Sequence, residues 1–316
     1  MKKNIDEKKR GRGKVLGFFV VLLLLFIVIY GNHLMNQKIF ITTYEVTDEN
    51  IPQAFDEYRI VQVTDVHSIR NVKQADLLYD KIMGQTPDVI VLTGDLLDSK
   101  YYTAEKNALK AGESEKMPGQ DTLDFVARLT KECPVYFVYG NHEMILLDDV
   151  RNNPFKVAME NSGVVFLNNN GVKITRDGES IYMLGIQDPS TLYKDRDYDA
   201  YDNHRDRINA MMQKVMSLRE EDLYTVVLSH RPEYFEEYKK YDGDLYLTGH
   251  AHGGQVRLPG IGGLYAPGQG VFPKYTNGLL SEDGTTMIIS RGIGNAVEVP
   301  RIFNPPEITL VILNRP

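Results

Sequence analysis

Eight short apolar runs recur along the chain, and each has about the length of one β-strand. They are rich in Val, Ile, Leu and Tyr, and they occupy residues 58–64, 87–93, 134–139, 181–186, 224–229, 244–248, 286–290 and 308–313. Runs of this length and composition, bounded by polar or turn-forming residues, predict buried strands. A chain with so many of them must fold around at least one β-sheet.

Helix-like segments lie between these runs. Apolar residues at three- and four-residue spacing predict helices at residues 74–85, 121–132, 153–163 and 204–220. The first half of the chain alternates strand and helix, which is typical of a layered α/β core. The second half is richer in strands, so we expect a mixed sheet rather than a purely parallel one.

Two polar stretches interrupt this order. Residues 99–120 and 188–204 are long for connections within a compact domain. Each is either a lid that faces a substrate or a solvated surface insertion, and the sequence does not decide between these alternatives.

The N-terminal residues differ in charge from the rest of the chain. Residues 1–14 contain seven Lys or Arg and two acidic residues, a net charge of +5, so the remainder carries −12 of the total −7. Residues 15–30 follow with no charge and no proline. This run is apolar on every side, unlike a surface helix, and it is slightly short of the about 20 residues that span a bilayer untilted.

We interpret residues 15–31 as an uncleaved transmembrane anchor, because no A-x-A-like cleavage site follows them. A cleaved signal peptide is the alternative. Positive charges stay on the cytoplasmic side, so residues 1–14 form a cytoplasmic tail. After a linker at 32–43, the folded domain at 44–316 then lies outside the cytoplasmic membrane. The sequence does not indicate an oligomeric state.

Composition excludes several classes of function. The acidic balance of the folded domain argues against a general nucleic-acid binder, which needs a basic face to displace counterions from phosphates. Cys133 is the only cysteine. The chain therefore has no disulfide framework, no thiolate zinc site and no iron–sulfur cluster.

Metal-binding residue types directly follow five of the apolar runs, where ligands gather in α/β sheets. In chain order they are Asp65 and His67, Asp95 and Asp98, Asn141, His142 and Glu143, His230, and finally His250 and His252. An isolated H-x-H pair is more often an ordinary polar loop, but five blocks in the same place after a strand argue against that interpretation. Glycines at 94, 140 and 249 precede three of these ligands, and we expect them to permit a sharp turn there.

The ligand types indicate which metals would bind. Asp, Asn and neutral imidazole without sulfur suit Mn²⁺, Fe or Zn²⁺. Even seven ligands among these ten residues would be too many for one ion. They suit two ions about 3.5–4 Å apart with one carboxylate between them, which can clamp the attacking and leaving oxygens of a displacement at phosphorus.

The ordered blocks D-x-H, G-D-x-x-D, G-N-H-E, H and G-H-x-H, from Asp65 to His252, resemble the signature of the calcineurin-like metallophosphoesterases. The apolar N-terminal run and the stretch RIFNPPEITLVIL from Arg301 further resemble the bacterial membrane-associated YkuE-type phosphoesterases. This resemblance implies an α/β fold for the domain at 44–316, a sandwich of two mixed β-sheets flanked by helices. It also implies a hydrolase that acts on a phosphoester, either a phosphodiester or a pyrophosphate.

The resemblance further implies a role for each residue of the signature. The ligands of one metal would be Asp65, His67 and His252, those of the other would be Asn141, His230 and His250, and Asp95 would bridge both. The expected cofactors are two divalent ions, Mn²⁺ first, with Fe or Zn²⁺ as alternatives. The implied reaction is in-line attack on phosphorus by a hydroxide that bridges the ions. His142 would protonate the leaving group, and Asp98 would orient His142.

The substrate is the least determined feature. Membrane anchoring, and relatives that cleave the pyrophosphate of an acylated sugar nucleotide, favour a lipid-linked or envelope phosphoester. Arg291 and Arg301 could grip a phosphate, but we interpret them as ordinary surface salt bridges because exposed Arg is common. A non-catalytic metal-binding scaffold is the alternative function, although a scaffold would be expected to lose ligands. A metallo-β-lactamase-like hydrolase would need H-x-H-x-D-H where this chain has HAHGGQ.

Overall fold

The computed structural model describes residues 2–146, 153–190, 201–219, 223–295 and 299–316. They form two compact units, Met1–Lys38 and Ile39–Pro316. The first unit is essentially one helix, α1 (Lys2–Asn36). Its part Gly17–Asn36 has a mean hydropathy of 2.4 and is long and apolar enough to cross a membrane, as a signal sequence near an N-terminus also is. The segment 32–43 contains the end of α1 and the first residues of strand β1.

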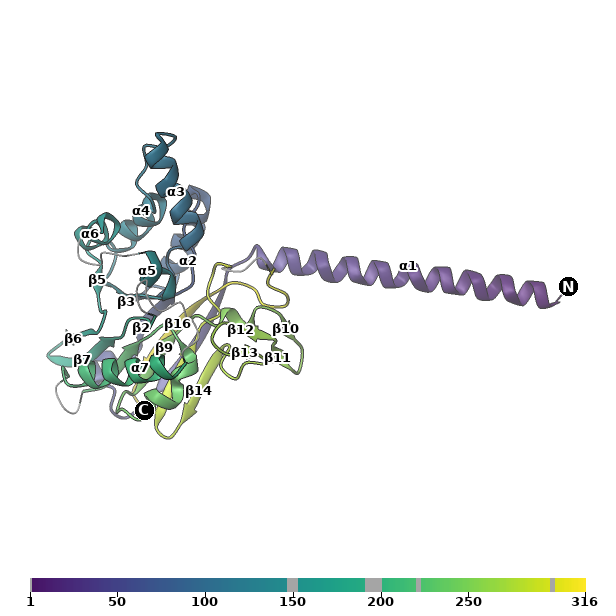
Figure 1. Ribbon diagram of the computed structural model, residues 1–316. Coiled ribbons are helices and arrows are strands. Elements are labelled where there is room, and N and C mark those ends of the chain that lie inside the picture. The colour runs from purple at the N-terminus through teal and green to yellow at the C-terminus, as the bar shows by residue number, and fades with distance from the viewer. Residues whose placement is uncertain (1, 147–152, 191–200, 220–222, 296–298) are drawn as a thin grey trace. The chain divides into compact units, whose positions relative to one another are not determined.

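The second unit contains two six-stranded mixed sheets (Figure 1). The first sheet has the order β1 (Phe40–Thr47), β16 (Glu307–Asn314), β2 (Tyr58–Val63), β3 (Val89–Thr93), β4 (Val135–Val138) and β5 (Val165–Phe166). The second has the order β14 (Gly278–Glu282), β15 (Thr285–Ile289), β9 (Leu245–Thr248), β8 (Thr225–Leu228), β7 (Glu179–Gly185) and β6 (Asn170–Arg176). All eight predicted strands are present, and the predicted sandwich of two mixed sheets is confirmed.

Side-chain alternation along the strands explains why two sheets stack. Val91 and Val226 point into the cluster between the sheets, whereas their neighbours Leu92 and Val227 point into the outer clusters. Successive side chains of a strand face opposite sides, so strands that are apolar throughout must be covered on both faces. One face of each sheet therefore packs on the other sheet, and the second face needs helices.

Helices cover both outer faces. On the first sheet lie α2 (Val72–Met83), α4 (Gln120–Leu129) and α6 (Pro154–Asn161), and on the second lie α7 (Tyr201–Met216) and α8 (Phe235–Tyr238). These include the four helices that apolar spacing predicts. The remaining short elements are η1 (Gln53–Phe55), α5 (Asn141–Leu146), η2 (Pro232–Tyr234), η3 (His252–Gly254), and the hairpin strands β10 (Arg257–Leu258), β11 (Gly262–Gly263), β12 (Tyr265–Ala266) and β13 (Gly270–Val271).

The polar stretch at 99–120 is not an irregular loop, because it contains helix α3 (Ser99–Ala111). Asp98 caps its first turn by accepting the N–H of Tyr101, and Gly112 ends it in the left-handed conformation. Tyr102 is its one buried residue, so the helix lacks the apolar stripe that makes a helix visible in a sequence. In the other polar stretch, residues 191–200 lie outside the described residues.

The parallel strands bring their carboxyl ends to one edge of each sheet. Strands β2, β3 and β4 are parallel in the first sheet, and β7, β8 and β9 are parallel in the second. The buried side chain of Gln62 connects these edges, because its Nε2 donates to Thr93 Oγ1 in the first sheet and to the Thr248 carbonyl in the second. Loops that leave β2, β3, β4, β8 and β9 therefore meet over a shared edge of the sandwich.

Candidate metal centre

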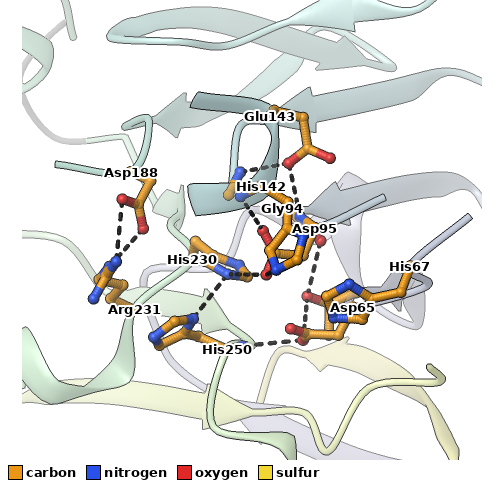
Figure 2. A network of polar contacts seen from close by, with 12 residues as sticks. Asp65, His67, Gly94, Asp95, His142, Glu143, Asp188, His230, Arg231 and His250 are labelled. Carbon is orange, nitrogen blue, oxygen red and sulfur yellow. Dashed lines mark hydrogen bonds and ion pairs between the residues drawn. The ribbon is translucent and has the colours of Figure 1, made fainter. Parts of the chain in front are cut away.

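Six of the nine predicted site residues form two fully buried clusters, in each of which the candidate ligand atoms lie within 4.8 Å of one another. His67, Asp98 and the partly buried His142 form a third group of the same kind. The first cluster is Asp65, His67 and His252, and the second cluster is Asp95, His230 and His250. All six residues are buried, with at most 4% of their surface exposed. Figure 2 shows side chains of both clusters converging from the loops at the strand ends.

Short distances within the clusters define the centre. In the first cluster, His252 Nε2 lies 3.2 Å from His67 Nε2 and 3.4 Å from Asp65 Oδ1. In the second, His230 Nε2 lies 3.2 Å from Asp95 Oδ2 and 3.1 Å from His250 Nδ1. The first cluster brings together loops after β2 and β9, and the second brings together loops after β3, β8 and β9. Residues far apart in the sequence thus present nitrogen and oxygen atoms to two neighbouring points.

Several buried polar atoms at the centre have no hydrogen-bond partner among the described residues. They are Asp65 Oδ1, Asn141 Oδ1, His67 Nδ1 and His250 Nε2. An unpaired buried acceptor costs about 1–3 kcal/mol, so such atoms rarely gather in one place without a ligand. Carboxylate, amide and imidazole acceptors together suit divalent metal ions, and the residues present therefore fit metal binding.

The backbone that carries these ligands is held in an uncommon conformation. Five of the seven predicted ligands have positive φ, between 46° and 62°: Asp65, His67, Asp95, His250 and His252. Such conformations cost of order 1–3 kcal/mol each for residues other than glycine, and they persist only where surrounding contacts enforce them. Here the loops support one another, because the N–H of Asp65 donates to Gly94 O and that of His67 donates to Asp95 O.

Of the three glycines that precede ligands, Gly140 and Gly249 are needed because no side chain fits beside the neighbouring loops, and only Gly94 has the positive φ of a sharp turn. Gly94 has φ of 92°, as the prediction of a sharp turn requires. Gly140 and Gly249 are not among the glycines with positive φ, so that reason is wrong for them. A Cβ at Gly140 would lie 2.3 Å from Asp95 Oδ1, and one at Gly249 would lie 2.2 Å from Thr64 Oγ1. The loops pack too closely there for any side chain.

Burial and charge set the protonation of the histidines. Burial lowers the pKa of His67 and of His252 to about 3, and it lowers the pKa of His250 well below the usual range. These three imidazoles are neutral, as metal binding requires. Burial also disfavours charge on His230, but the carboxylate of Asp95 outweighs it and raises the pKa of His230 to about 10. A metal ion must displace that proton.

Hydrogen bonds behind the ligands orient them. His230 Nδ1 lies 2.8 Å from the carbonyl of Thr93, which leaves Nε2 as the ligand atom of that ring. Asp65 Oδ2 accepts from Thr64 Oγ1 at 2.9 Å and from the N–H of His250 at 3.0 Å. One oxygen of this carboxylate is thereby fixed, and the other remains for an ion.

The imidazole of His142 is held by the backbone N–H of Ser99, the residue after Asp98, rather than by the Asp98 carboxylate itself. Its Nδ1 accepts the N–H of Ser99 at 3.0 Å, which places the proton of the neutral ring on Nε2, 4.0 Å from Asp95 Oδ2. Asp98 Oδ1 accepts the N–H of Tyr101 at 2.7 Å, and a carboxylate oxygen of Asp98 lies within 4.8 Å of a His142 ring nitrogen. The side chain of His142 is 15% exposed, against at most 5% for those of His230, His250 and His252.

Glu143 had no role in the sequence analysis, yet it joins two of the ligand loops. Its side chain is fully buried; Oε2 accepts the N–H groups of Asp95 and Gly140, and Oε1 accepts that of Leu97, all at 2.9 Å. Burial and the charge of Asp95 raise its pKa to about 7. The position of Glu143 in the GNHE block could have marked it as a site residue, but a sequence cannot show which N–H groups a carboxylate reaches.

A buried ion-pair network borders the second cluster and was also missed. Arg231, which follows His230, donates to Asp188 Oδ2 at 2.5 Å (Figure 2). It also donates to Glu233 Oε1 at 3.3 Å. Glu233 Oε1 lies 4.0 Å from His250 Nε2. Burying these charges is tolerable only because they are paired, so the network fixes the loop that follows His230 to the loop that carries Asp188.

The C-terminal segment reaches the first cluster. Arg291 forms a salt bridge, with Nε 2.7 Å from Glu307 Oε2, but the pair is largely buried rather than at the surface, because the Glu307 side chain is 1% exposed. The prediction of a surface salt bridge is wrong for Arg301, which is 4% exposed, with Nη2 3.2 Å from His252 Nδ1 and 2.8 Å from the Arg291 carbonyl. Asn304, fully buried, donates to the His252 carbonyl at 2.6 Å. These side chains brace the loop that carries His252.

The comparison with protein families decides the class of this chain. The model of the calcineurin-like phosphoesterase family matches residues 58–254, more than half of the chain. The chain belongs to the calcineurin-like phosphoesterase family. It is therefore a metal-dependent phosphoester hydrolase, and the match covers all five blocks that carry the predicted ligands.

Relatives extend the similarity over most of the chain. The uncharacterized metallophosphoesterase YkuE of Bacillus subtilis strain 168 is 25% identical over 290 residues, which cover 90% of this chain and 88% of that protein. The phosphodiesterase YaeI of Escherichia coli K12 is 25% identical over 259 residues, covering 81% and 82%. The UDP-2,3-diacylglucosamine pyrophosphatase LpxG of Chlamydia trachomatis is 24% identical over 330 residues, covering 90% and 92%. The resemblance to the YkuE-type proteins is confirmed.

Proposed function

We propose that this phosphoesterase works with two divalent ions held side by side. Asp65, His67 and His252 would hold one ion, Asn141, His230 and His250 would hold the other, and Asp95 would bridge both. The observation that carries this proposal is the pair of buried three-residue clusters. The charge of Asp95, which lies in the second cluster, also acts on the pKa of His67 and His252 in the first.

The proposed reaction is in-line hydrolysis of a phosphodiester or pyrophosphate. When bound, two divalent ions supply Lewis acidity at phosphorus and lower the pKa of the attacking water. His142 donates a proton from Nε2 to the leaving oxygen, because Ser99 occupies Nδ1 and the ring is the more exposed one. Asp98 acts through α3, since it caps the helix whose first N–H holds His142.

The choice of ions and substrate rests on broader arguments. Oxygen and imidazole ligands without sulfur favour Mn²⁺, with Fe or Zn²⁺ as alternatives. Two relatives carry the names of a phosphodiesterase and a pyrophosphatase that acts on a diacylated sugar nucleotide. Together with the apolar helix, these names support a lipid-linked or envelope phosphoester as substrate.

We also propose that α1 anchors the chain in the membrane. Residues 15–31 would cross the bilayer, residues 1–14 would remain in the cytoplasm, and the domain at 44–316 would lie outside it. The length and hydropathy of Gly17–Asn36 support the anchor, and the +5 charge before it supports the orientation.

Substitution of the bridging carboxylate tests the two-ion proposal. The full chain in detergent should contain close to two equivalents of Mn²⁺ by elemental analysis and hydrolyse bis-p-nitrophenyl phosphate. Asp95→Asn should lose metal and most of the turnover, whereas the control Asp244→Asn, before the amino end of β9, should keep both. Wild-type metal content and turnover in Asp95→Asn would refute the bridging role. Metal binding without hydrolysis of phosphodiesters or pyrophosphates would favour the scaffold alternative.

A further inference from the structure

Two small hairpins, labelled β10 to β13 in Figure 1, follow the loop of His252 in the chain, and they carry exposed apolar side chains. Strands β10 and β11 form the first hairpin, and β12 and β13 form the second. We call their exposed apolar side chains the hairpin surface; these are Leu258, Ile261, Tyr265, Val271 and Phe272. Ile261 is 62% exposed, and Val271 and Phe272 are each 68% exposed. Large apolar side chains left in water at this density mark an interaction site.

The hairpin surface has a defined structure rather than being a loose loop. Leu258 pairs with Gly262 across the first hairpin, and Tyr265 pairs with Val271 across the second. The N–H of Phe272 donates to the Leu264 carbonyl at 2.9 Å, which joins the end of the second hairpin to the residue between β11 and β12. Leu258 and Ile261 also line a shallow concavity of about 440 Å³ with Phe303.

The hairpins are attached directly to the loop that carries His252. The N–H of Leu264 donates to the Gly254 carbonyl at 3.1 Å, and a Cβ at Gly254 would lie 2.5 Å from the Cα of Gly263. Arg257 Nη1 also donates to the Gly253 carbonyl at 2.7 Å. Whatever the hairpin surface contacts is therefore held close to the metal centre.

The charge around the hairpins differs from that of the rest of the domain. Residues 245–281 contain no Asp or Glu, and their Lys and Arg residues are Arg257 and Lys274. The chain outside residues 1–14 carries −12 overall. In the structure Lys274 lies 3.6 Å from Glu236, outside this segment. An acidic body is repelled by an anionic lipid surface, so an apolar segment without carboxylates of its own is the part that such a surface repels least.

We propose that the hairpin surface enters the apolar boundary of the lipid bilayer that anchors the chain. This inference rests on the membrane anchor proposed above. Residues 32–36 continue α1 beyond the proposed span at 15–31 over about 8 Å. Residues 37–39 then link α1 to β1 over at most about 15 Å. An anchored domain is thus confined to the bilayer surface, where the hairpins are the apolar element suited to contact it.

This contact has a consequence for the substrate. A bilayer touched by the hairpins lies beside the His252 loop, so the metal centre works at the depth of lipid head groups. Phosphoester linkages of membrane lipids lie at that depth. The chemical class of substrate that fits is therefore a lipid whose phosphoester is cleaved without leaving the bilayer.

Tryptophan fluorescence can test the contact, because the chain contains no Trp. Phe272→Trp places a single reporter on the hairpin surface, and Val157→Trp places a matched control on α6, where Val157 is 40% exposed. Each full-length variant is reconstituted in vesicles of phosphatidylglycerol and phosphatidylcholine, with and without brominated acyl chains. We expect a blue-shifted emission that bromine quenches at least twofold for position 272, and a water-like, unquenched emission for position 157.

The outcomes separate this proposal from the anchor on which it rests. A chain that leaves the vesicles in alkaline carbonate would refute both the anchor and the bilayer contact. A chain that stays, with position 272 emitting like position 157, would refute the contact alone. A blue-shifted emission that bromine does not quench would show that protein, such as a second copy of the chain, covers the surface instead, and would also refute the contact.

Discussion

Glu143→Gln is the substitution that best tests how the metal centre is built. Glu143 accepts three buried N–H groups, two at Oε2 and one at Oε1. Glutamine has the same shape but only one acceptor oxygen. If that oxygen keeps the N–H groups of Asp95 and Gly140, the amide NH₂ must face the N–H of Leu97, and two donors meet without an acceptor.

The expected loss of stability follows from this count. One buried N–H left unsatisfied costs about 1–3 kcal/mol. Above about pH 7, where the Glu143 carboxyl is charged, the two retained hydrogen bonds also weaken because glutamine is neutral. For a domain of this size, 1 kcal/mol shifts the melting temperature by roughly 2–4 °C. Glu143→Ala would leave three such groups, at about 3–9 kcal/mol, which approaches the whole stability of a typical domain.

The assay follows melting temperature and metal content together. Glu143→Gln should melt lower in detergent because the N–H of Leu97 loses its acceptor. It should also hold less Mn²⁺, because the hydrogen bond to the N–H of Asp95, the proposed bridging ligand, weakens. Asp244→Asn is the control: Asp244 accepts the N–H of Thr225 at 2.7 Å, an acceptor that Asn retains. A Glu143→Gln protein with unchanged melting temperature, metal content and turnover would show that the contacts of Glu143 do not hold the centre together.

Three further predictions concern the same centre. His142→Ala should lower turnover by about 10²–10⁴-fold on alkyl phosphodiesters, with metal content retained. The loss on p-nitrophenyl esters should be modest, because p-nitrophenolate leaves without needing a proton. Equal losses on both substrates would contradict the proton-donor role. Mn²⁺ added to the ion-free protein at pH 7 should release protons in an unbuffered titration, because His230, with a pKa of about 10, is protonated there until the metal binds. Without metal, the His230–Asp95 ion pair contributes its full stabilisation of the fold below about pH 6.5, the usual pKa of histidine. This stabilisation is lost as the pH rises through about 10. Gly249→Ala should cost about 1–3 kcal/mol and displace Asp65, since the new Cβ would lie 2.5 Å from Asp65 Oδ2; full metal occupancy in that variant would contradict the packing argument.

The core of the fold could be read from the sequence because its strands are buried on both faces. Such strands are apolar without interruption, and their signal survives in a single sequence. Strand β6 gave no comparable signal: none of its residues is buried, and it lies at the edge of the second sheet. Helix α3 was hidden for the related reason that only Tyr102 is buried. Strands and helices that bury few side chains show only a weak apolar pattern in the sequence.

The candidate ligands could be found because parallel strands impose a rule. A loop that follows a parallel strand leaves the sheet at the same edge as its neighbours, so ligand residue types after Thr64, Thr93 and Thr248 were expected to meet. This rule does not predict which groups each side chain contacts. Glu143 and Arg231 lie beside predicted ligands in the sequence, yet their roles depend on which N–H or carboxylate group the fold brings within 3 Å.

The contacts that Arg301 and Asn304 make beside His252 were not predicted, for a different reason, which is the direction of the last strand. Strand β16 is antiparallel to β2, with Thr309 opposite Gln62, so β16 begins at the edge where β2 ends. Residues that precede β16 therefore arrive beside Asp65 and His252, although they follow no parallel strand. The sequence predicted a mixed sheet but not which strand was reversed. In a mixed sheet, a search for site residues has to include those that precede antiparallel strands as well as those that follow parallel ones.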